Sequence, residues 1–278
     1  MARFAWCTDI HLDFIDTNKT IAFINALRTQ NIDGVLLTGD ISIANLLPQH
    51  LGMIEAGLEV PIYFVLGNHD YFGSSIEDVR KEMKDLSNMS THLKYLATTP
   101  YVALSSTTAV VGHDGWYDAL YGDWKSGRFV MQDFLQIKDF VENGGGQGRF
   151  KNGFEDMNAI VTKAQELAMQ GVQHVHDGIK AAVRYHKNII VMTHFPPFEE
   201  SHIHNGRVGA AYAQPWYTSK LMGDMLRQAA TAFPAVRFTV LAGHTHGKFD
   251  GEIVKNMTCH VGGVEYGRPT MQSIVEVS

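Results

Sequence analysis

The feature that most constrains this chain is where its Asp, Asn and His residues lie relative to its apolar runs. Five short polar clusters each come directly after an apolar segment of strand type. Because the carboxyl ends of parallel strands meet at one edge of an open α/β sheet, we expect the clusters to form a single site. In chain order they are Asp9-Ile10-His11, Gly39-Asp40, Gly67-Asn68-His69-Asp70, His194, and Gly243-His244-Thr245-His246.

Short apolar runs rich in Val, Ile and Phe alternate with stretches of helical periodicity in the first half of the chain. This alternation predicts strand-helix-strand units, and crossovers of this kind favour a mostly parallel sheet. Three later runs, at 251–254, 257–261 and 271–277, are of antiparallel type. The other predicted strands cover 3–8, 34–38, 61–66, 108–112, 188–192 and 236–241, and predicted helices cover 18–29, 48–58, 74–86 and 219–233.

The pattern changes between residues 116 and 187, where long helical stretches such as 155–186 carry few strand signals. We therefore predict a single domain over residues 1–278, with a helical cap inserted over 116–187. The glycine-rich segment 142–148 is the expected hinge, because glycines rarely sit inside a regular element. A surface loop is favoured there over a phosphate-binding nest, since no strand leads into the segment.

The composition excludes some classes of partner and predicts a globular protein. The chain has 278 residues, of which 45% are hydrophobic, enough for a large core. A net charge of −6 gives no general basic field that would collect nucleic acid or anionic membrane. No membrane-spanning run or signal-peptide pattern is apparent, so we expect a cytoplasmic protein. Cys7 and Cys259 lie in strand-like segments and are predicted to be free, buried thiols.

The donor types in the five clusters indicate a metal centre. Imidazole nitrogens with carboxylate and amide oxygens, and no cysteine sulfur, suit Mn, Fe, Zn, Ni or Co better than Ca or Mg. A catalytic zinc site usually has about three protein ligands plus water, so a larger set predicts two divalent cations that share a carboxylate. The seven candidate ligands are Asp9, His11, Asp40, Asn68, His194, His244 and His246.

The order of these motifs resembles the signature of calcineurin-like metallophosphoesterases. The motifs are Asp-x-His, Gly-Asp, Gly-Asn-His-Asp, His and Gly-His-Thr-His. The resemblance implies an α/β four-layer sandwich, in which two mixed sheets pack face to face between helical layers. It also implies a bridging Asp40. The third motif ends in Asp70 where Ser/Thr protein phosphatases have Glu, so it looks more like bacterial phosphodiesterases. The implied ligand sets are Asp9, His11, Asp40 and His246 for one cation, and Asp40, Asn68, His194 and His244 for the other.

Two cations roughly 3.5 to 4 Å apart can hold a bridging hydroxide in line with phosphorus and polarise the phosphoryl oxygens. His69 lies beside Asn68 but outside the implied ligand set. We therefore expect it to face the substrate, where it would stabilise charge or protonate the leaving oxygen. Asp70 is expected to accept the other ring hydrogen of His69 and orient it, although a turn role stays open.

Three further histidines are candidates for a substrate pocket. His113 ends an apolar run, and a pocket role and a plain turn role suit it equally. His202 and His204 lie on the loop after His194, where contact with substrate and simple solvation are both open. Core packing and stacking on a substrate ring are both open for the aromatic cluster at the start of the cap, which comprises Trp116, Tyr117, Tyr121 and Trp124.

The expected function is metal-dependent hydrolysis of a small-molecule phosphodiester. The first alternative is a phosphomonoesterase acting on a nucleotide, sugar phosphate or phosphoprotein. A nuclease would need a basic groove, which the acidic composition disfavours. A non-catalytic scaffold is disfavoured by the complete ligand set and by His69. We expect a small phosphate ester as partner, no nucleic acid and no membrane, with the cap as a candidate surface for self-association.

Overall fold

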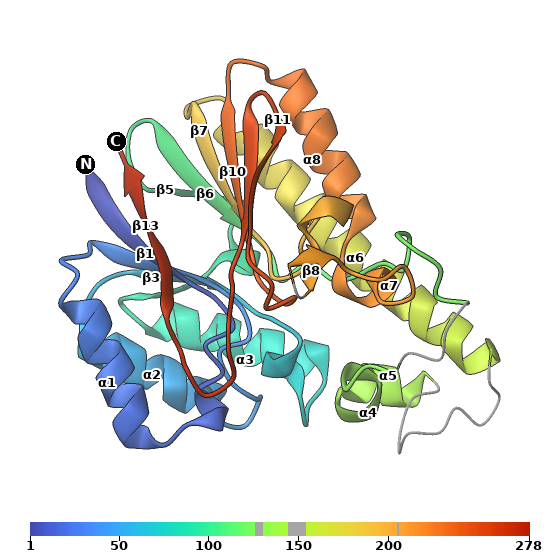
Figure 1. The fold of residues 1–278 in the computed structure, drawn as a ribbon. Coiled ribbons are helices and arrows are strands. Elements are labelled where there is room, and N and C mark those ends of the chain that lie inside the picture. The colour runs from blue at the N-terminus through green and yellow to red at the C-terminus, as the bar shows by residue number, and fades with distance from the viewer. Residues whose placement is uncertain (126–129, 144–153, 205) are drawn as a thin grey trace.

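The fold contains two β-sheets that face each other, as Figure 1 shows for a computed structural model. The structure describes residues 1–125, 130–143, 154–204 and 206–278. The first sheet has the order β13-β1-β2-β3-β4, and all its neighbours are parallel except β13 and β1. Its strands are β1 (Ala2–Cys7), β2 (Gly34–Thr38), β3 (Ile62–Val65), β4 (Leu93–Tyr95) and β13 (Met271–Val277).

The second sheet has the order β11-β12-β10-β7-β6-β5 and is also mixed. Strands β12, β10, β7 and β6 are parallel neighbours, while β11 and β5 run antiparallel at the two edges. The predicted antiparallel strand at 257–261 is β12. It is antiparallel to β11, as predicted, but parallel to its other neighbour, β10, so the prediction is wrong for that pair. The strands are β5 (Val102–Ala103), β6 (Thr108–Gly112), β7 (Asn188–Met192), β10 (Arg237–Ala242), β11 (Phe249–Val254) and β12 (Met257–Val261).

Helices cover the outer face of each sheet, and three buried clusters fill the resulting interfaces (Figure 1). Side chains such as Trp6, Val110 and Met192 pack between the two sheets. Burial of each large apolar side chain stabilises the fold by roughly 1.5–3 kcal/mol. The four-layer α/β sandwich is confirmed. The first sheet is covered by α1 (Thr17–Arg28), α2 (Leu47–Leu58) and α3 (Ile76–Met89), and the second by α6 (Phe154–Ala182) and α8 (Lys220–Ala232).

Local capping explains where two of these helices begin. The Asp16 side chain accepts a hydrogen bond from the Lys19 amide at the start of α1. The Ser75 side chain accepts one from the Asp78 amide at the start of α3. Each cap satisfies an amide that has no partner within the helix. The predicted helices at 18–29 and 74–86 are thus confirmed within a few residues.

The segment between β6 and β7 is helical, as the pattern predicts. It contains α4 (Asp133–Gln136), α5 (Lys138–Glu142) and α6. The C-terminal half of α6 packs on the second sheet through Val175 and Ile179, while its N-terminal half extends toward α4 and α5 (Figure 1). Part of this insertion therefore belongs to the outer helical layer. The expected hinge lies mostly outside the described residues.

The remaining elements are short and lie mainly in the loops around the strand ends. Cys7 and Cys259 are buried free thiols, as predicted. Within the described part of the chain, no helix combines the length and apolar character that crossing a bilayer would demand. The short elements are β8 (Ile203–His204), β9 (Arg207–Val208), α7 (Gln214–Tyr217) and the 3₁₀ turns η1 (Leu12–Phe14), η2 (His69–Tyr71), η3 (Leu96–Thr98) and η4 (Glu199–Ser201).

Candidate metal centre

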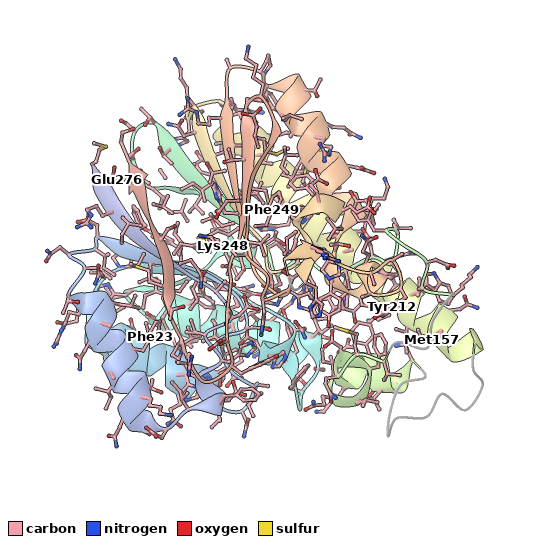
Figure 2. The ribbon with its side chains drawn as sticks, in the orientation of Figure 1. Phe23, Met157, Tyr212, Lys248, Phe249 and Glu276 are labelled. Carbon is pink, nitrogen blue, oxygen red and sulfur yellow. The ribbon has the colours of Figure 1, made fainter. Side chains whose placement is uncertain are left out.

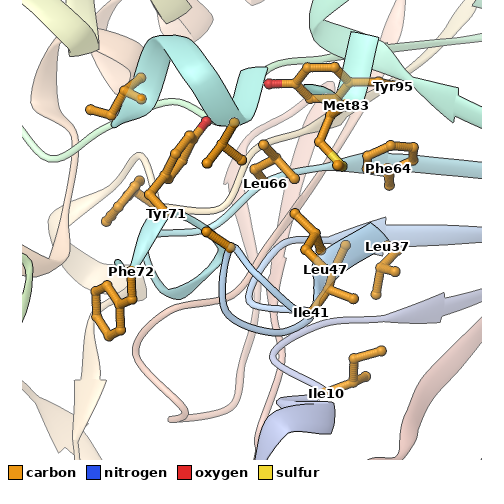
Figure 3. Packing of buried hydrophobic residues seen from close by; sticks show 14 of the residues in the cluster. Ile10, Leu37, Ile41, Leu47, Phe64, Leu66, Tyr71, Phe72, Met83 and Tyr95 are labelled. Atoms are coloured by element: carbon orange, nitrogen blue, oxygen red, sulfur yellow. The ribbon is translucent and has the colours of Figure 1, made fainter. Parts of the chain in front are cut away.

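The seven candidate ligands come together at the carboxyl ends of five parallel strands. The first sheet contributes residues that follow β1, β2 and β3, and the second contributes residues that follow β7 and β10. Apolar neighbours in these loops hold them in place. Ile10, Ile41 and Leu66 are buried against the helices that cover the first sheet (Figure 3). The polar side chains are thereby left to face the junction between the sheets.

Two groups of donors form at this junction. Asp9, His11, Asp40 and His246 make one group, and Asp40, His194 and His244 make the other. Within each group, one donor atom from each residue lies within 4.8 Å of all the others. Asp40 belongs to both groups, as the sequence resemblance implies for a bridging ligand.

The geometry of the first group fits a cation. The Nε2 atoms of His11 and His246 face each other at 3.2 Å, which two lone pairs tolerate only when they share a proton or a cation. His246 Nε2 also lies 3.3 Å from Asp9 Oδ1, and His11 Nε2 lies 3.7 Å from Asp40 Oδ2. The convergence of nitrogen and carboxylate donors on one point is typical of a transition-metal site.

In the second group, backbone carbonyls fix the ring orientations. His194 Nδ1 donates to the Thr38 carbonyl at 2.9 Å, which leaves Nε2 facing Asp40 Oδ1 at 3.4 Å. His244 Nε2 donates to the Trp216 carbonyl at 3.1 Å, so its other nitrogen is the one available to a cation. Carbonyl partners of this kind set the tautomer of a metal-binding histidine.

Asn68 lies directly beside the second group. Its Oδ1 lies 3.1 Å from His194 Nε2. Its Nδ2 donates to Asp133 Oδ1 at 2.8 Å, and both side chains are buried. The amide oxygen, which is the metal-binding end of an asparagine, therefore faces the other donors.

The charge balance of the site also favours cations. Asp9 and Asp40 are each 1% exposed, and all their ion-pair partners among the described residues are histidines. Burial opposes protonation of His194, but the carboxylates of Asp40 and Asp9 outweigh it and raise its pKa to about 10. Burial and His194 lower the pKa of His244 to about 3. Buried carboxylates are costly unless compensated, and divalent ions would supply that compensation.

The backbone at these positions adopts a conformation that is uncommon outside glycine. Eight described non-glycine residues have positive φ, and five of them are candidate ligands: Asp9, His11, Asp40, His244 and His246. Each such residue costs on the order of 1–3 kcal/mol and persists where the surrounding structure enforces it. Position 67 requires glycine for a steric reason, because a Cβ there would collide with Asp40 Oδ1. The loops are therefore shaped to aim side chains rather than to minimise backbone energy.

His69 lies beside the shared carboxylate, but Asp70 does not act on it as expected. The His69 amide donates to Asp40 Oδ1 at 2.9 Å, and His69 lines a cavity that opens over the two donor groups. Asp70 instead accepts from the backbone amides of Ile41, Ser42 and Gly67 at 2.8–2.9 Å. The expected hydrogen bond to the His69 ring is not found among the described residues, because both carboxylate oxygens of Asp70 are used to join two ligand-bearing loops.

A cavity of about 460 Å³ opens over the two groups. Its lining includes two of the three predicted pocket histidines, His202 and His204, and His202 stacks on Tyr217 with ring centroids 5.0 Å apart. His113 is not part of the lining. It is buried beneath α6, where its ring lies 5.3 Å from that of His174, so the structure places its side chain outside this cavity.

Several residues of the site carry no recognisable sequence signal. Asp133, Tyr217 and Tyr266 line the cavity, and the Tyr266 ring lies 4.5 Å from that of His11. Figure 2 shows the neighbouring Tyr212, another lining residue, on the side of the molecule that carries α4 to α7.

In the aromatic cluster at the start of the insertion, Trp116 and Tyr117 are fully buried core residues, which excludes stacking on a substrate for these two.

The structure is similar to several solved structures over nearly its whole length. It matches a dimetal phosphatase from Danio rerio with a TM-score of 0.58 and 13% identity, covering 95% of this chain and 88% of that one. It matches phosphopantetheinyl hydrolase from Mycobacterium tuberculosis with a TM-score of 0.63 and 10% identity, covering 94% and 88%. A protein of Thermus thermophilus gives a TM-score of 0.53 and 11% identity, covering 94% and 88%.

At these identities the structural matches establish the fold alone. No curated protein matches the sequence. The model of the calcineurin-like phosphoesterase family matches residues 2–248, a range that includes all seven candidate ligands and His69. This chain belongs to the calcineurin-like phosphoesterase family.

Proposed function

We propose that this protein is a two-metal phosphodiesterase that acts on a small molecule. The observation that carries the proposal is the pair of donor groups that share Asp40 beneath a cavity. Two divalent ions bound there would activate a water molecule and polarise the phosphoryl oxygens of an ester. The imidazole, carboxylate and amide donors suit Mn, Fe, Zn, Ni or Co.

The cavity supports a small-molecule substrate. Its volume of about 460 Å³ lies within the usual range of small-molecule sites, roughly 300–1,000 Å³. Its walls combine apolar and aromatic groups such as Met131 and Tyr266 with the buried polar groups of Asp133 and His202. We also propose that the segment 116–187 acts as a cap, because four of its residues line the cavity: Val130, Met131, Gln132 and Asp133.

The preference for a diester rests on the Gly-Asn-His-Asp motif and can be tested directly. The chain is stripped with a chelator, reconstituted with Mn, Zn, Ni or Fe, and assayed on bis-p-nitrophenyl phosphate and p-nitrophenyl phosphate. We expect metal-restored cleavage that favours the diester. A preference for the monoester would indicate a phosphomonoesterase, and absence of turnover with two ions bound would indicate a binding scaffold.

His69→Ala is expected to lower turnover by about 10²- to 10⁴-fold, the usual contribution of a general acid or base. The metal content should not change, because His69 lies outside both donor groups. Steady-state kinetics and metal analysis of the same preparation test both statements. His176→Ala, which removes a partly exposed histidine of α6, is the control. Unchanged turnover in His69→Ala would exclude the assigned role.

A further inference from the structure

The side-chain amide of Asn68 is held at both of its ends. Its Oδ1 lies 3.1 Å from His194 Nε2, within the second donor group, and its Nδ2 donates to Asp133 Oδ1 at 2.8 Å. Asn68 is 3% exposed and Asp133 is fully buried. An asparagine amide presents an acceptor at one end and donors at the other, so a flip would aim NH₂ hydrogens at the cation. The metal site therefore needs a partner that selects one orientation.

Asp133 provides such a partner. We propose that Asp133 is a positioning residue that fixes the Asn68 amide with its oxygen toward the second cation. The inference rests on the proposed two-metal function and adds a structural role for the insertion: it completes the second half of the metal centre as well as covering the cavity. No other described side chain hydrogen-bonds to Asn68 Nδ2.

The position of Asp133 is itself fixed by the insertion. Asp133 begins α4, and the backbone between α4 and α5 is joined to the loop that follows Asn68. Gly73 N donates to the Gln136 carbonyl at 2.9 Å, and Lys138 N donates to the Ser74 carbonyl at 3.0 Å. These two bonds tie the residues that carry Asp133 to the chain segment that carries Asn68.

Aromatic packing fixes α4 from its other side. Phe134, the neighbour of Asp133, is fully buried with its ring 5.2 Å from that of Trp216. The carbonyl of Trp216 is the one that orients His244. The short helix that carries Asp133, which contacts Asn68, is thus packed through Phe134 against Trp216, the residue that orients His244. Contacts that orient the ligands of a metal without touching the ion commonly set the affinity of the site.

The test is the affinity of each ion in variants of Asp133. We expect Asp133→Ala to weaken binding of the second ion by about 10- to 100-fold while the first ion keeps its affinity. Mn²⁺ titration in competition with a chelator measures both affinities, and electron paramagnetic resonance reports the spin-coupled Mn pair. Asp133→Asn retains an acceptor oxygen at this position and should restore most of the affinity.

Two comparisons separate positioning from a general loss of packing. Asp139→Ala removes the hydrogen bond to the Ile76 amide and the ion pair with Lys163. It should loosen the same insertion without changing either affinity. In an Asn68→Ala background, Asp133→Ala should cause no further loss, because the residue acts through that amide. Asp133→Ser, which is too short to reach Asn68, replaces the alanine variant should the latter fail to fold.

The proposal is overturned by any of three results. These are unchanged affinity for the second ion in Asp133→Ala, an equal loss in Asp139→Ala, or an additive loss in the Asn68→Ala background. Failure of the unmodified chain to bind two ions would instead overturn the two-metal function on which this inference rests. The two failures are therefore distinguishable in the same titration.

Discussion

Asp40→Asn is expected to lower turnover by at least about 10³-fold and to leave fewer than two ions bound per chain. Asp40 is the residue common to both donor groups, with Oδ2 near His11 and Oδ1 near His194. An amide keeps the shape of the side chain but loses its charge and one of its two acceptor oxygens. A metal ion supplies several kcal/mol of transition-state stabilisation, and each 1.36 kcal/mol is a factor of about ten in rate.

Metal analysis after gel filtration and steady-state kinetics on the same preparation test this expectation. Circular dichroism verifies that the variant is folded, since Asn retains an oxygen that can accept from the His69 amide. Asp250→Asn, at an exposed ion pair with Lys248, is the matched control and should bind two ions. Retention of both ions in Asp40→Asn would contradict a shared carboxylate.

Asp114→Ala should have the largest effect on stability, lowering the free energy of unfolding by about 3–5 kcal/mol. Asp114 is fully buried and accepts hydrogen bonds from four donors: the Leu66 amide, the Tyr71 and Tyr95 hydroxyls, and Arg80 Nε at 3.0 Å. These donors come from the end of β3, η2, β4 and α3. The alanine variant would leave the partly buried guanidinium of Arg80 without its carboxylate. Figure 3 shows the side chains of Leu66, Tyr71 and Tyr95 in the packed apolar cluster.

Urea denaturation of the apo-protein measures this change through the midpoint and slope of the transition. Asp85→Ala, which removes an exposed ion pair with Lys81, is the control and should leave the urea midpoint nearly unchanged. An unchanged midpoint for Asp114→Ala would show that the four donors find solvent or other partners at no cost.

The Asp114 contribution should also depend on pH. Burial alone would raise the pKa of this carboxyl, but Arg80, His113 and the Tyr71 hydroxyl outweigh it and hold the pKa below the ordinary value. The unfolded chain therefore takes up the proton first as the pH falls. The stabilisation is complete above the unfolded carboxyl pKa of about 3.9 and is lost as the pH falls through the lowered folded value. The difference between the wild type and Asp114→Asn should accordingly stay constant from about pH 7 to about pH 5 and shrink as the pH falls below about 4 in urea titrations.

Much of the regular structure could be predicted from local patterns. The strands that lead into the site are continuous apolar runs bounded by ligand motifs, and the helices between them have side-chain caps at Asp16 and Ser75. The short strands β4, β5, β8 and β9 cannot be predicted from the sequence, because two or three residues carry no measurable periodicity and are defined by the partner strand. The direction of β12 likewise depends on which neighbour it meets.

At the site, residues that are neighbours in the sequence do not always become partners in space. Asp70 follows His69 directly, yet its carboxylate turns to the backbone of the loop after β2, 28 to 29 positions earlier in the chain. His113 follows a strand, as the ligands do, but its side chain packs against α6 instead of entering the cavity. A residue's place at a strand end is local information, whereas the direction of its side chain depends on what packs around it.

The sequence by itself determined the fold class, the family and the seven donors that meet at the strand ends, because each motif is read from residues that are contiguous in the chain. Only the tertiary structure decided what surrounds those donors. Asp133 lies 65 positions from Asn68, and Asp114 lies 48 positions from Leu66. A single buried carboxylate in an insertion has no local signature, since its partner is defined only when the packed core brings the two together and excludes the water that would otherwise satisfy both.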